Sequence, residues 1–243
     1  MSRGRIAWLS DTDSPDAFPP VESALTDPEG LLAAGGDLSR DRLLAAYVRG
    51  IFPWYEEGQP VLWWSPDPRC VLWPDQLHIS RRLRQQLRNS TAEIRFNTTF
   101  ASVVEQCAGK RRSQQGTWIT QEMKAAYEHL HNEGWAHSIE VWTDDKLVGG
   151  LYGLCIGRVF FGESMFSAAA NASKMAMIGL TRHMLANDLR LLDCQVVSPH
   201  LLTLGATTIP RREFTSFLAK ACQPPLPHDA WPHEPVPVQL FIA

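Results

Sequence analysis

The chain has 243 residues, of which 44% are hydrophobic and 20% charged, a composition that is typical of globular proteins and excludes a disordered chain or a coiled coil. At roughly 150 residues per domain, this length predicts one or two domains. The net charge of −3 argues against a protein that binds polyanions over its whole surface.

The cysteine pattern indicates a reducing compartment, and the hydropathy pattern indicates a protein without a membrane helix. The cysteines are odd in number and widely spaced, which argues against a disulfide framework or a zinc ribbon. No apolar run approaches the roughly 18 residues that a membrane helix needs, and the first residues lack the apolar core of a signal peptide. We therefore expect a cytoplasmic protein that is neither bound to a membrane nor exported.

The N-terminal part is predicted to form short helices and irregular loops. A helix is expected after Asp37 or Ser39, either of which is a suitable cap, and Gly50 would end it. Five prolines in residues 51–74 exclude a long regular element there. This stretch also holds four tryptophans, which would either fill a small core or offer rings for stacking: Trp54, Trp63, Trp64 and Trp73.

Basic residues are concentrated in residues 78–112. This stretch contains eight arginines and lysines and two glutamates, a net charge of +6, so the rest of the chain has a net charge of −9. Arg81, Arg84 and Arg88 are three and four residues apart, so a helix would place them along one side. Such a face is either a solvated helix surface or a footprint for nucleic acid or phosphate, and the spacing favours the second.

From residue 90 onward the pattern predicts alternating helices and strands. Helices are expected over residues 97–108, 120–133 and 171–187. Three strands joined by tight turns at Asp144-Asp145 and Gly157-Arg158 are expected over residues 137–166, and a further strand over residues 189–197. The proline-rich tail from Gln223 is expected to form an extended strap over the surface.

Two polar residues interrupt the apolar strand LLDCQVV. Alternation along a strand would point Asp193 and Gln195 to one face, about 7 Å apart. Buried polar groups need partners, so the two are either a structural hydrogen-bond pair or a functional one. In the functional interpretation the Asp193 carboxylate accepts a hydrogen bond from the Gln195 amide and fixes the direction of the Gln195 carbonyl.

A carboxylate also follows an apolar strand in the segment FFGESMF. Glu163 is flanked by aromatic and methionine side chains, so it must be hydrogen-bonded, shifted in pKa or functional. Other chemical motifs are missing: the sequence contains no phosphate-binding glycine loop and no nucleophile elbow. His129 and His131 would diverge on their helix, so we expect no metal site.

Short segments spread over nearly the whole chain match the pattern of one family. In chain order they are FPPVESALTDPEGLLAAGGDLS, RLLAAYVRGIFPWY, LWWSPDPRCVLWP, HISRRLR, GTWIT, HSIEVW, LVGGLYG, FFGESMF, NASK, LLDCQ and LGATTIPRREF. The WWSPDPR, GESMF and DCQ blocks are the most specific of these. On these segments the sequence resembles the leucyl/phenylalanyl-tRNA–protein transferases of bacteria.

The resemblance implies an enzyme that moves leucine or phenylalanine, less often methionine, from its tRNA to an N-terminal arginine or lysine of a protein, which marks that protein for degradation. It implies no cofactor, metal or membrane and a monomeric state. The implied fold is α+β: a small N-terminal domain, residues 1–67, and a C-terminal domain like the GNAT acetyltransferases, residues 68–243, with a mixed sheet flanked by helices and an extended tail.

The resemblance also implies site residues. Trp54 and Trp118 match the residues that hold the terminal adenosine of the tRNA. The amino-acid side-chain pocket matches Leu151, Phe160, Met177 and Leu192. The polar catalytic centre matches Glu163, Asp193 and Gln195. The basic face that meets the tRNA acceptor stem matches Arg81, Arg82, Arg84 and Arg88.

The chain departs from the family pattern at two places, and two rival functions remain. Ala168 stands where the family has an arginine after MFS, and Ser198 stands where many members have an asparagine. One rival is an acetyl-CoA-dependent N-acetyltransferase, but its pyrophosphate-binding signature is absent between Phe161 and Ser173. The other rival is a non-catalytic module that binds the tRNA acceptor end.

Overall fold

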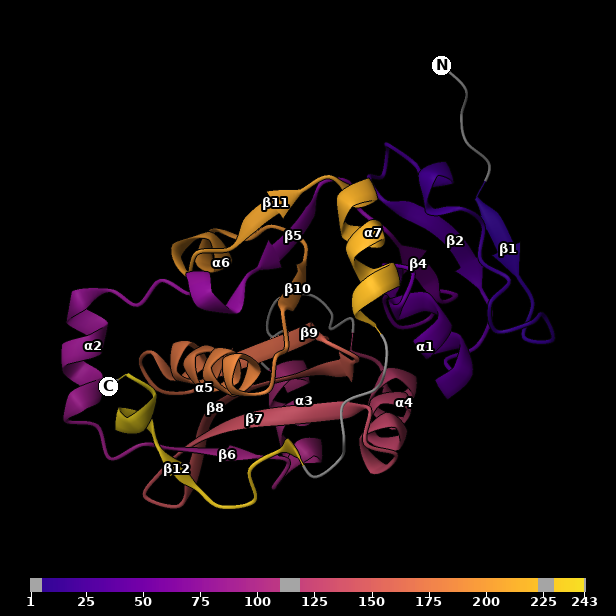
Figure 1. The fold of residues 1–243 in the computed structure, drawn as a ribbon. Helices are drawn as coiled ribbons and strands as arrows, with labels where there is room; N and C mark the ends of the chain where they lie inside the picture. Colours follow the sequence, from indigo (N-terminus) through magenta and orange to yellow (C-terminus); the bar gives the residue numbers. More distant parts are fainter. Residues whose placement is uncertain (1–5, 110–118, 223–229, 243) are drawn as a thin grey trace.

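The structure is a computed structural model that describes residues 6–109, 119–222 and 230–242, and its strands form two β-sheets (Figure 1). The smaller sheet and α1 lie at one end of the molecule, the larger sheet lies at the other, and α7 lies between them (Figure 1). Within the described ranges, no helix has the length and apolar character needed to cross a membrane.

The smaller sheet has the strand order β1-β2-β4-β3 and belongs to the N-terminal part of the chain. Its strands are β1 (Ala7–Leu9), β2 (Leu31–Gly35), β3 (Phe52–Pro53) and β4 (Leu62–Trp64). The helix α1 (Arg40–Tyr47) follows β2, with Ser39 as its N-cap residue, and Gly50 takes a positive φ of 76° just after it. The predicted helix is confirmed, but the prediction of only helices and loops here is wrong.

Tryptophans of the 51–74 segment occupy different environments. Trp63 is fully buried, packs edge-on against Phe18 with ring centroids 4.9 Å apart, and donates from its indole to the Gly35 carbonyl at 2.8 Å. Trp54, by contrast, is 42% exposed. The core interpretation therefore holds for Trp63, while Trp54 remains partly exposed to solvent.

The larger sheet has the strand order β11-β5-β10-β9-β8-β7-β6-β12. Its strands are β5 (Arg69–Leu72), β6 (Glu93–Phe96), β7 (Ala136–Thr143), β8 (Lys146–Ile156), β9 (Val159–Ser167), β10 (Leu191–Gln195), β11 (Thr207–Ile209) and β12 (Val236–Pro237). Among these described strands, β9 and β10 are the one parallel pair, and every other neighbouring pair is antiparallel. The α+β class is thus confirmed, with a mixed sheet.

Helices α3 (Phe100–Gly109) and α5 (Ala172–Ala186) cover the two faces of the larger sheet. The other helices of this part of the chain are α2 (Arg81–Arg88), α4 (Gln121–Asn132), α6 (Pro199–Thr203) and α7 (Arg211–Ala221). Neighbouring glycines of β8 show the two faces: a Cβ on Gly149 would collide with Ala172 of α5, and one on Gly150 would lie in van der Waals contact with Val103 of α3, at 3.5 Å. Because strand residues alternate in direction, α3 and α5 lie on opposite sides of the sheet.

Most of the predicted C-terminal elements are confirmed within a few residues. Thr120 caps α4 by accepting from the Met123 amide at 3.2 Å, and tight turns with positive φ at Asp144, Asp145 and Gly157 join β7, β8 and β9. The helix predicted over residues 171–187 is α5, with Asn171 as its N-cap residue.

The helix predicted over residues 97–108 begins three residues late, at Phe100. Asn97 has a left-handed φ of 59°, and the backbone amides of Thr98 and Thr99 donate to Oε1 of the buried Glu140 at 2.9 and 2.8 Å. A carboxylate from a neighbouring strand thus satisfies the amides ahead of the helix.

The described part of the C-terminal tail, residues 230–242, lies across the edge of the larger sheet. Strand β12 pairs with β6, and the short 3-10 helix η4 (Val238–Phe241) follows it. Trp231 is buried between the rings of His137 and His183, with centroids 4.1 and 4.2 Å away. The expected strap is therefore anchored by an aromatic side chain as well as by strand pairing.

Candidate active site

A cavity of about 390 Å³ opens where the two parallel strands of the larger sheet separate. Strands β9 and β10 are paired up to Phe161 and Asp193, after which β9 continues along β8 and β10 along β5. The carboxyl ends of parallel strands that part in this way leave a crevice suited to a ligand. The cavity lies at this point, with walls from β8, β9, β10, α5, α6 and the segment after β3.

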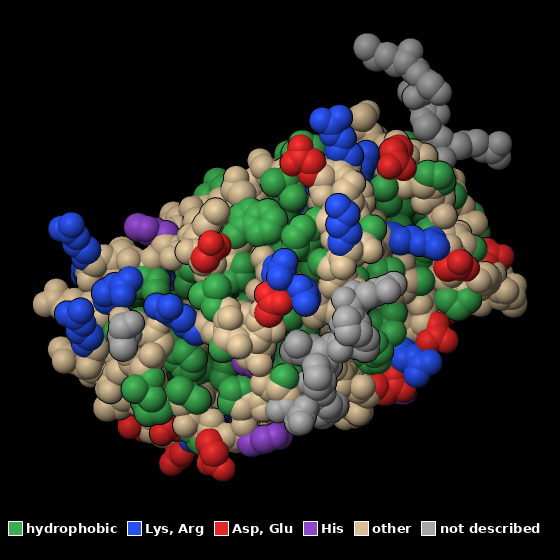
Figure 2. Space-filling model, in the orientation of Figure 1, with side chains coloured by type: hydrophobic (Ala, Val, Ile, Leu, Met, Phe, Trp, Pro, Cys, Tyr) green, Lys and Arg blue, Asp and Glu red, His purple; other side chains and the backbone are tan. Residues whose placement is uncertain are grey.

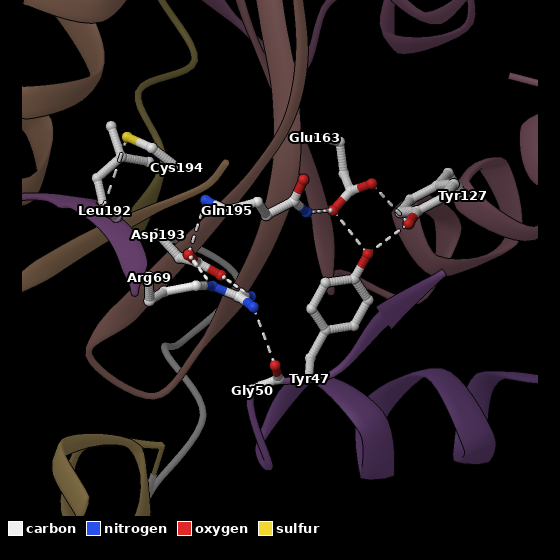
Figure 3. Close-up of polar contacts among 9 residues, drawn as sticks. All are labelled: Tyr47, Gly50, Arg69, Tyr127, Glu163, Leu192, Asp193, Cys194 and Gln195. Atoms are coloured by element: carbon white, nitrogen blue, oxygen red, sulfur yellow. Dashed lines mark hydrogen bonds and ion pairs between the residues drawn. The ribbon is translucent and has the colours of Figure 1, made fainter. Parts of the chain in front are cut away.

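Both parting strands carry an irregularity at the cavity. Against β8, the register of β9 places Gly162 and Ser164 opposite adjacent residues, so Glu163 is an extra residue in a bulge. Against β5, the register of β10 skips Cys194, and Gln195 has a left-handed φ of 60°. Bulges re-aim side chains, and these two direct Glu163 and Gln195 toward each other (Figure 3).

Asp193 is fully buried and forms an ion pair with Arg69, which is 1% exposed. The guanidinium donates from Nε to Oδ1 at 2.8 Å and from Nη2 to Oδ2 at 2.6 Å, which is the bidentate geometry that arginine forms with carboxylates (Figure 3). The Asp193 Oδ1 atom also accepts from the backbone amide of Gln195 at 2.9 Å. The carboxylate is thus fully engaged inside the protein.

The Gln195 side chain bonds to Glu163 and not to Asp193. Its Nε2 donates to Oε1 of Glu163 at 2.8 Å (Figure 3). The expected bond between the Asp193 carboxylate and the Gln195 side-chain amide is therefore wrong. In a regular strand, alternating side-chain directions would place Asp193 and Gln195 on one face. Gln195, however, is the last residue of β10 and has a left-handed backbone conformation, which turns its side chain toward β9.

Two tyrosine hydroxyls complete the surroundings of Glu163. Tyr47 of α1 donates to Oε1 at 2.6 Å, and Tyr127 of α4 donates to Oε2 at 2.8 Å. The two hydroxyl oxygens also lie 2.5 Å from each other (Figure 3). Because both hydroxyls donate to the carboxyl, the two phenols and Glu163 form one closely packed polar cluster.

Burial raises the pKa of Glu163 from 4.5 to about 7, although the hydrogen bonds from Tyr47, Tyr127 and Gln195 oppose this shift. The negative charge of Asp193 raises it further. The pKa of each tyrosine is also raised well above 10, first by burial and then by the nearby Glu163 charge. Both phenols therefore hold their protons near neutral pH, whereas the carboxyl is present there in both its protonated and its ionised form.

Apolar side chains form the wall opposite the polar cluster. Leu151, Met177 and Leu192, three of the residues predicted to form the amino-acid side-chain pocket, line the cavity. Phe160 does not line it: this ring is fully buried behind the cavity and packs near Trp231, with centroids 6.2 Å apart. Further lining comes from Met165 and Leu180, which motif comparison missed because an apolar residue in a strand or helix carries no signal of its own.

Trp54 lies at the opening of the cavity, half-exposed, with its ring near that of Trp64 at a centroid distance of 5.7 Å. Its backbone is held by two hydrogen bonds: the amide donates to the Leu62 carbonyl, and the carbonyl accepts from the Trp64 indole side chain. The second tryptophan of the predicted adenosine site, Trp118, lies outside the described residues.

The basic residues of α2 form a surface away from the cavity. Arg81, Arg82 and Arg88 are exposed, whereas Arg84 is half-buried and donates from Nη1 to the Ile242 carbonyl at 3.1 Å. Figure 2 shows Lys and Arg side chains gathered over the end of the molecule where Figure 1 places α2. The predicted helix is confirmed, with one of its four arginines engaged by the C-terminal strap.

Three residues of the polar cluster were not predicted as site residues from the sequence: Arg69, Tyr47 and Tyr127. Both tyrosines stand at apolar helix positions, where an aromatic residue indicates core packing. Arg69 was the one with a usable signal, since it is a charged residue that begins the otherwise apolar strand RCVL. Across the described ranges, no group of three His, Cys, Asp or Glu side chains could hold a metal ion.

The mixed sheet and the apolar cavity where its parallel strands part define an α+β protein with a candidate ligand site, bounded by a buried carboxyl, an amide and a paired aspartate. Two family models match the chain: the leucyl/phenylalanyl-tRNA protein transferase model over residues 71–219 and the model of the N-terminal domain of that transferase over residues 36–67. The chain belongs to this family of transferases and is an enzyme.

Curated relatives agree with the family models. A leucyl/phenylalanyl-tRNA–protein transferase of Azoarcus sp. (strain BH72) is 57% identical over 215 residues, which cover 88% of this chain and 90% of the relative. A protein of the same name from Pseudomonas aeruginosa (strain PAO1) is 54% identical, with 90% and 97% covered. Another from Chromohalobacter salexigens is 53% identical, with 90% and 86% covered.

Proposed function

We propose that the protein transfers leucine or phenylalanine, less often methionine, from aminoacyl-tRNA to the N-terminal arginine or lysine of acceptor proteins, and so marks them for degradation. One observation carries this proposal: an apolar cavity whose polar side is formed by Gln195 and Glu163. Membership of the transferase family supports the reaction class.

The cavity is proposed to take the amino-acid side chain of the donor between Leu151, Met177 and Leu192. An apolar wall discriminates by size and burial, at about 1–3 kcal/mol per methylene, so it favours leucine or phenylalanine over small or charged side chains. Trp54, half-exposed at the opening, is placed to stack on the terminal adenine, a contact that is worth about 1–3 kcal/mol and is indifferent to the base sequence.

In the proposed reaction the neutral α-amine of the acceptor attacks the ester carbon of the donor. A carbon–nitrogen bond forms, the bond between the carbonyl carbon and the ribose 3′-oxygen breaks, and the proton lost by the amine ends on that oxygen. The ester supplies the activation, so the reaction as written balances with no further reactant. An α-amine has a pKa near 8, and a useful fraction is therefore neutral at pH 7.

Gln195 is proposed to orient the attacking amine. Its Nε2 is occupied by Glu163, which leaves the carbonyl oxygen to accept a hydrogen bond from the amine. An amide carbonyl is too weakly basic to keep a proton, so its contribution is positioning, a source of large rate effects. Glu163, held by two tyrosines, fixes which end of the amide faces the substrate.

Finer features of the architecture belong to the same proposal. A division at residues 67 and 68 is supported by the change from the small sheet, which ends at Trp64, to the large sheet, which begins at Arg69. A GNAT-like C-terminal domain is supported by the parting parallel pair β9 and β10 in a mixed sheet. We propose further that the enzyme is a cytoplasmic monomer and that the exposed arginines of α2 contact the tRNA acceptor stem.

The test is transfer of radiolabelled phenylalanine from Phe-tRNA to a peptide that begins with arginine. The wild-type enzyme should label this peptide and a lysine-starting one, but not an alanine-starting one. Gln195→Ala should reduce kcat far more than affinity for Phe-tRNA, while Gln59→Ala, an exposed glutamine in another segment, should match wild type. Binding of Phe-tRNA without transfer by the wild-type protein would favour a binding module instead.

A further inference from the structure

The Arg69 guanidinium is fixed by contacts with four residues, which come from three segments of the chain. Besides its two bonds to Asp193, it donates from Nη1 to the Gly50 carbonyl at 3.0 Å. Its planar group also lies over the rings of Phe52 and Phe214, 4.7 Å from each centroid. A guanidinium held between two aromatic rings and paired in a fork has a single orientation.

The interaction continues from Asp193 to the backbone of Gln195. A non-glycine residue with φ near 60° occupies a sparsely populated region and persists only where its surroundings hold it there. Here the Asp193 Oδ1 atom accepts from the Gln195 amide at 2.9 Å. The same backbone conformation brings the Gln195 side chain to Glu163 (Figure 3).

We propose that Arg69 is a positioning residue for aminoacyl transfer: through Asp193 it holds the backbone of Gln195 in the conformation that aims the amide at the attacking amine. Asp193 and Gln195 line the cavity whereas Arg69 does not, so Arg69 acts without touching the substrate. This inference rests on the proposed function and assigns a role in it to a residue that has no contact with either substrate.

A lysine at position 69 keeps the positive charge but cannot form the fork or stack between two rings. Arg69→Lys should therefore release Asp193 and Gln195 without removing the charge that compensates the buried carboxylate. We expect kcat to fall roughly 10- to 100-fold while KM for Phe-tRNA stays within about threefold, because loss of alignment affects the transition state more than ground-state binding.

The decisive experiment is a double-mutant cycle in the transfer assay. If Arg69 acts through Gln195, the Arg69→Lys/Gln195→Ala enzyme has the same kcat as Gln195→Ala alone. Arg42→Lys is the matched control, since Arg42 is also 1% exposed and donates to the Ser10 and Asp13 carbonyls away from the cavity. It should leave kcat within about twofold of wild type in the folded enzyme.

Three results would overturn the proposal. They are a wild-type kcat in Arg69→Lys, a loss in the double mutant equal to the product of the single losses, and a kcat loss in Arg42→Lys as large as that in Arg69→Lys. The wild-type enzyme is assayed alongside, and its failure to transfer phenylalanine would instead reject the proposed function, and this inference with it.

A second variant covers the case in which Arg69→Lys does not fold. Phe214→Leu removes one ring beside the guanidinium and leaves the ion pair in place. Its unfolding midpoint is measured first, and kcat is then measured below that midpoint. We expect a smaller kcat loss that disappears in the Gln195→Ala background. An equal loss in both backgrounds would show that the packing acts independently of Gln195 and would overturn the proposal.

Discussion

Glu163 shows how burial and hydrogen bonding compete at a single residue. Three donors surround the carboxyl, and such bonds stabilise the ionised form, yet the pKa is raised to about 7 because the group is removed from water. Near neutral pH the carboxyl is therefore poised between its two forms.

This pKa predicts a pH-dependent stability. The unfolded glutamate titrates near 4.5 and the folded one near 7, so the contribution of Glu163 is fully present below about 4.5 and is lost as pH rises through about 7. Relative to wild type, Glu163→Gln should gain up to about 3 kcal/mol in unfolding free energy over this window. Urea denaturation at about pH 5 and about pH 8 measures it.

The control for this measurement is Glu57→Gln, which changes an exposed glutamate outside the cavity. Its difference from wild type should be the same at both pH values. If the difference for Glu163→Gln is also the same at both pH values, Glu163 titrates alike in the folded and unfolded chains. The raised pKa of Glu163 in the folded protein would then be wrong.

At the scale of elements, the polar cluster joins parts of the chain that pack against different sides of the site. Tyr47 comes from α1 in the N-terminal part, Tyr127 from α4, and Glu163 from the bulge of β9. Each hydroxyl therefore ties a helix to the sheet at the edge of the cavity, and the three groups form one hydrogen-bonded unit.

Removal of either hydroxyl should destabilise the protein. Tyr47→Phe and Tyr127→Phe should each lower the unfolding free energy by about 1–3 kcal/mol, because Glu163 loses a buried partner. The double variant should lose less than the sum, since the first substitution already disrupts the shared network. Tyr55→Phe, whose hydroxyl lies 3.2 Å from Thr120, is the matched control and should act additively with either.

The helix α2 gives a second prediction at this scale. Single changes of Arg81, Arg82 or Arg88 to Gln should each raise KM for Phe-tRNA. In a plot of log KM against log salt concentration, each change should also lower the slope by about one. Arg84→Gln should affect the slope less, because Arg84 already donates to the Ile242 carbonyl. Phenylalanyl-adenosine lacks the acceptor stem, so its KM should be unchanged in all four variants.

The elements that sequence alone predicted well are those with local signals. The helix over residues 120–133 has a cap at Thr120 and a stop at Gly134, and the hairpins of β7, β8 and β9 turn at residues that tolerate positive φ. The N-terminal sheet has no such signal. Its strands are two to five residues long, and β2 pairs with β4 some thirty residues away, so no alternating pattern has room to form.

The same distinction applies to the candidate site. Asp193, Gln195 and Glu163 stand out because each is a polar residue in an apolar strand. Which residues pair with them cannot be predicted from the sequence, because a pairing such as Arg69 with Asp193 spans 124 residues and depends on the folded sheet. Alternation also fails at Gln195, where a left-handed residue redirects the side chain.

At the scale of the whole molecule, the C-terminal strap closes the far edge of the large sheet. Trp231 is 3% exposed and stacks between His137 and His183. Burial lowers the pKa of His183 to about 4, so that ring is neutral near pH 7 and offers an uncharged face. The last described residues then reach α2 and α5 through the Ile242 and Phe241 carbonyls.

Trp231→Ala should therefore destabilise the protein by about 3–5 kcal/mol, as truncation of a buried aromatic residue does. The matched control is Trp8→Ala, because Trp8 is 71% exposed and its loss should change stability by no more than about 0.5 kcal/mol. Urea denaturation of both variants measures this. If Trp231→Ala changes the unfolding free energy as little as Trp8→Ala does, the C-terminal tail contributes little to the stability of the folded protein.

The long sequence separations in the polar cluster set the order in which a growing chain can become active. Tyr47 lies 116 residues before Glu163, and Arg69 lies 124 residues before Asp193. During translation the first partner of each pair leaves the ribosome long before the second, and contacts of this length are slow to form. An incomplete polypeptide thus has neither its paired aspartate nor its aimed amide, and catalytic competence is acquired only near the end of synthesis.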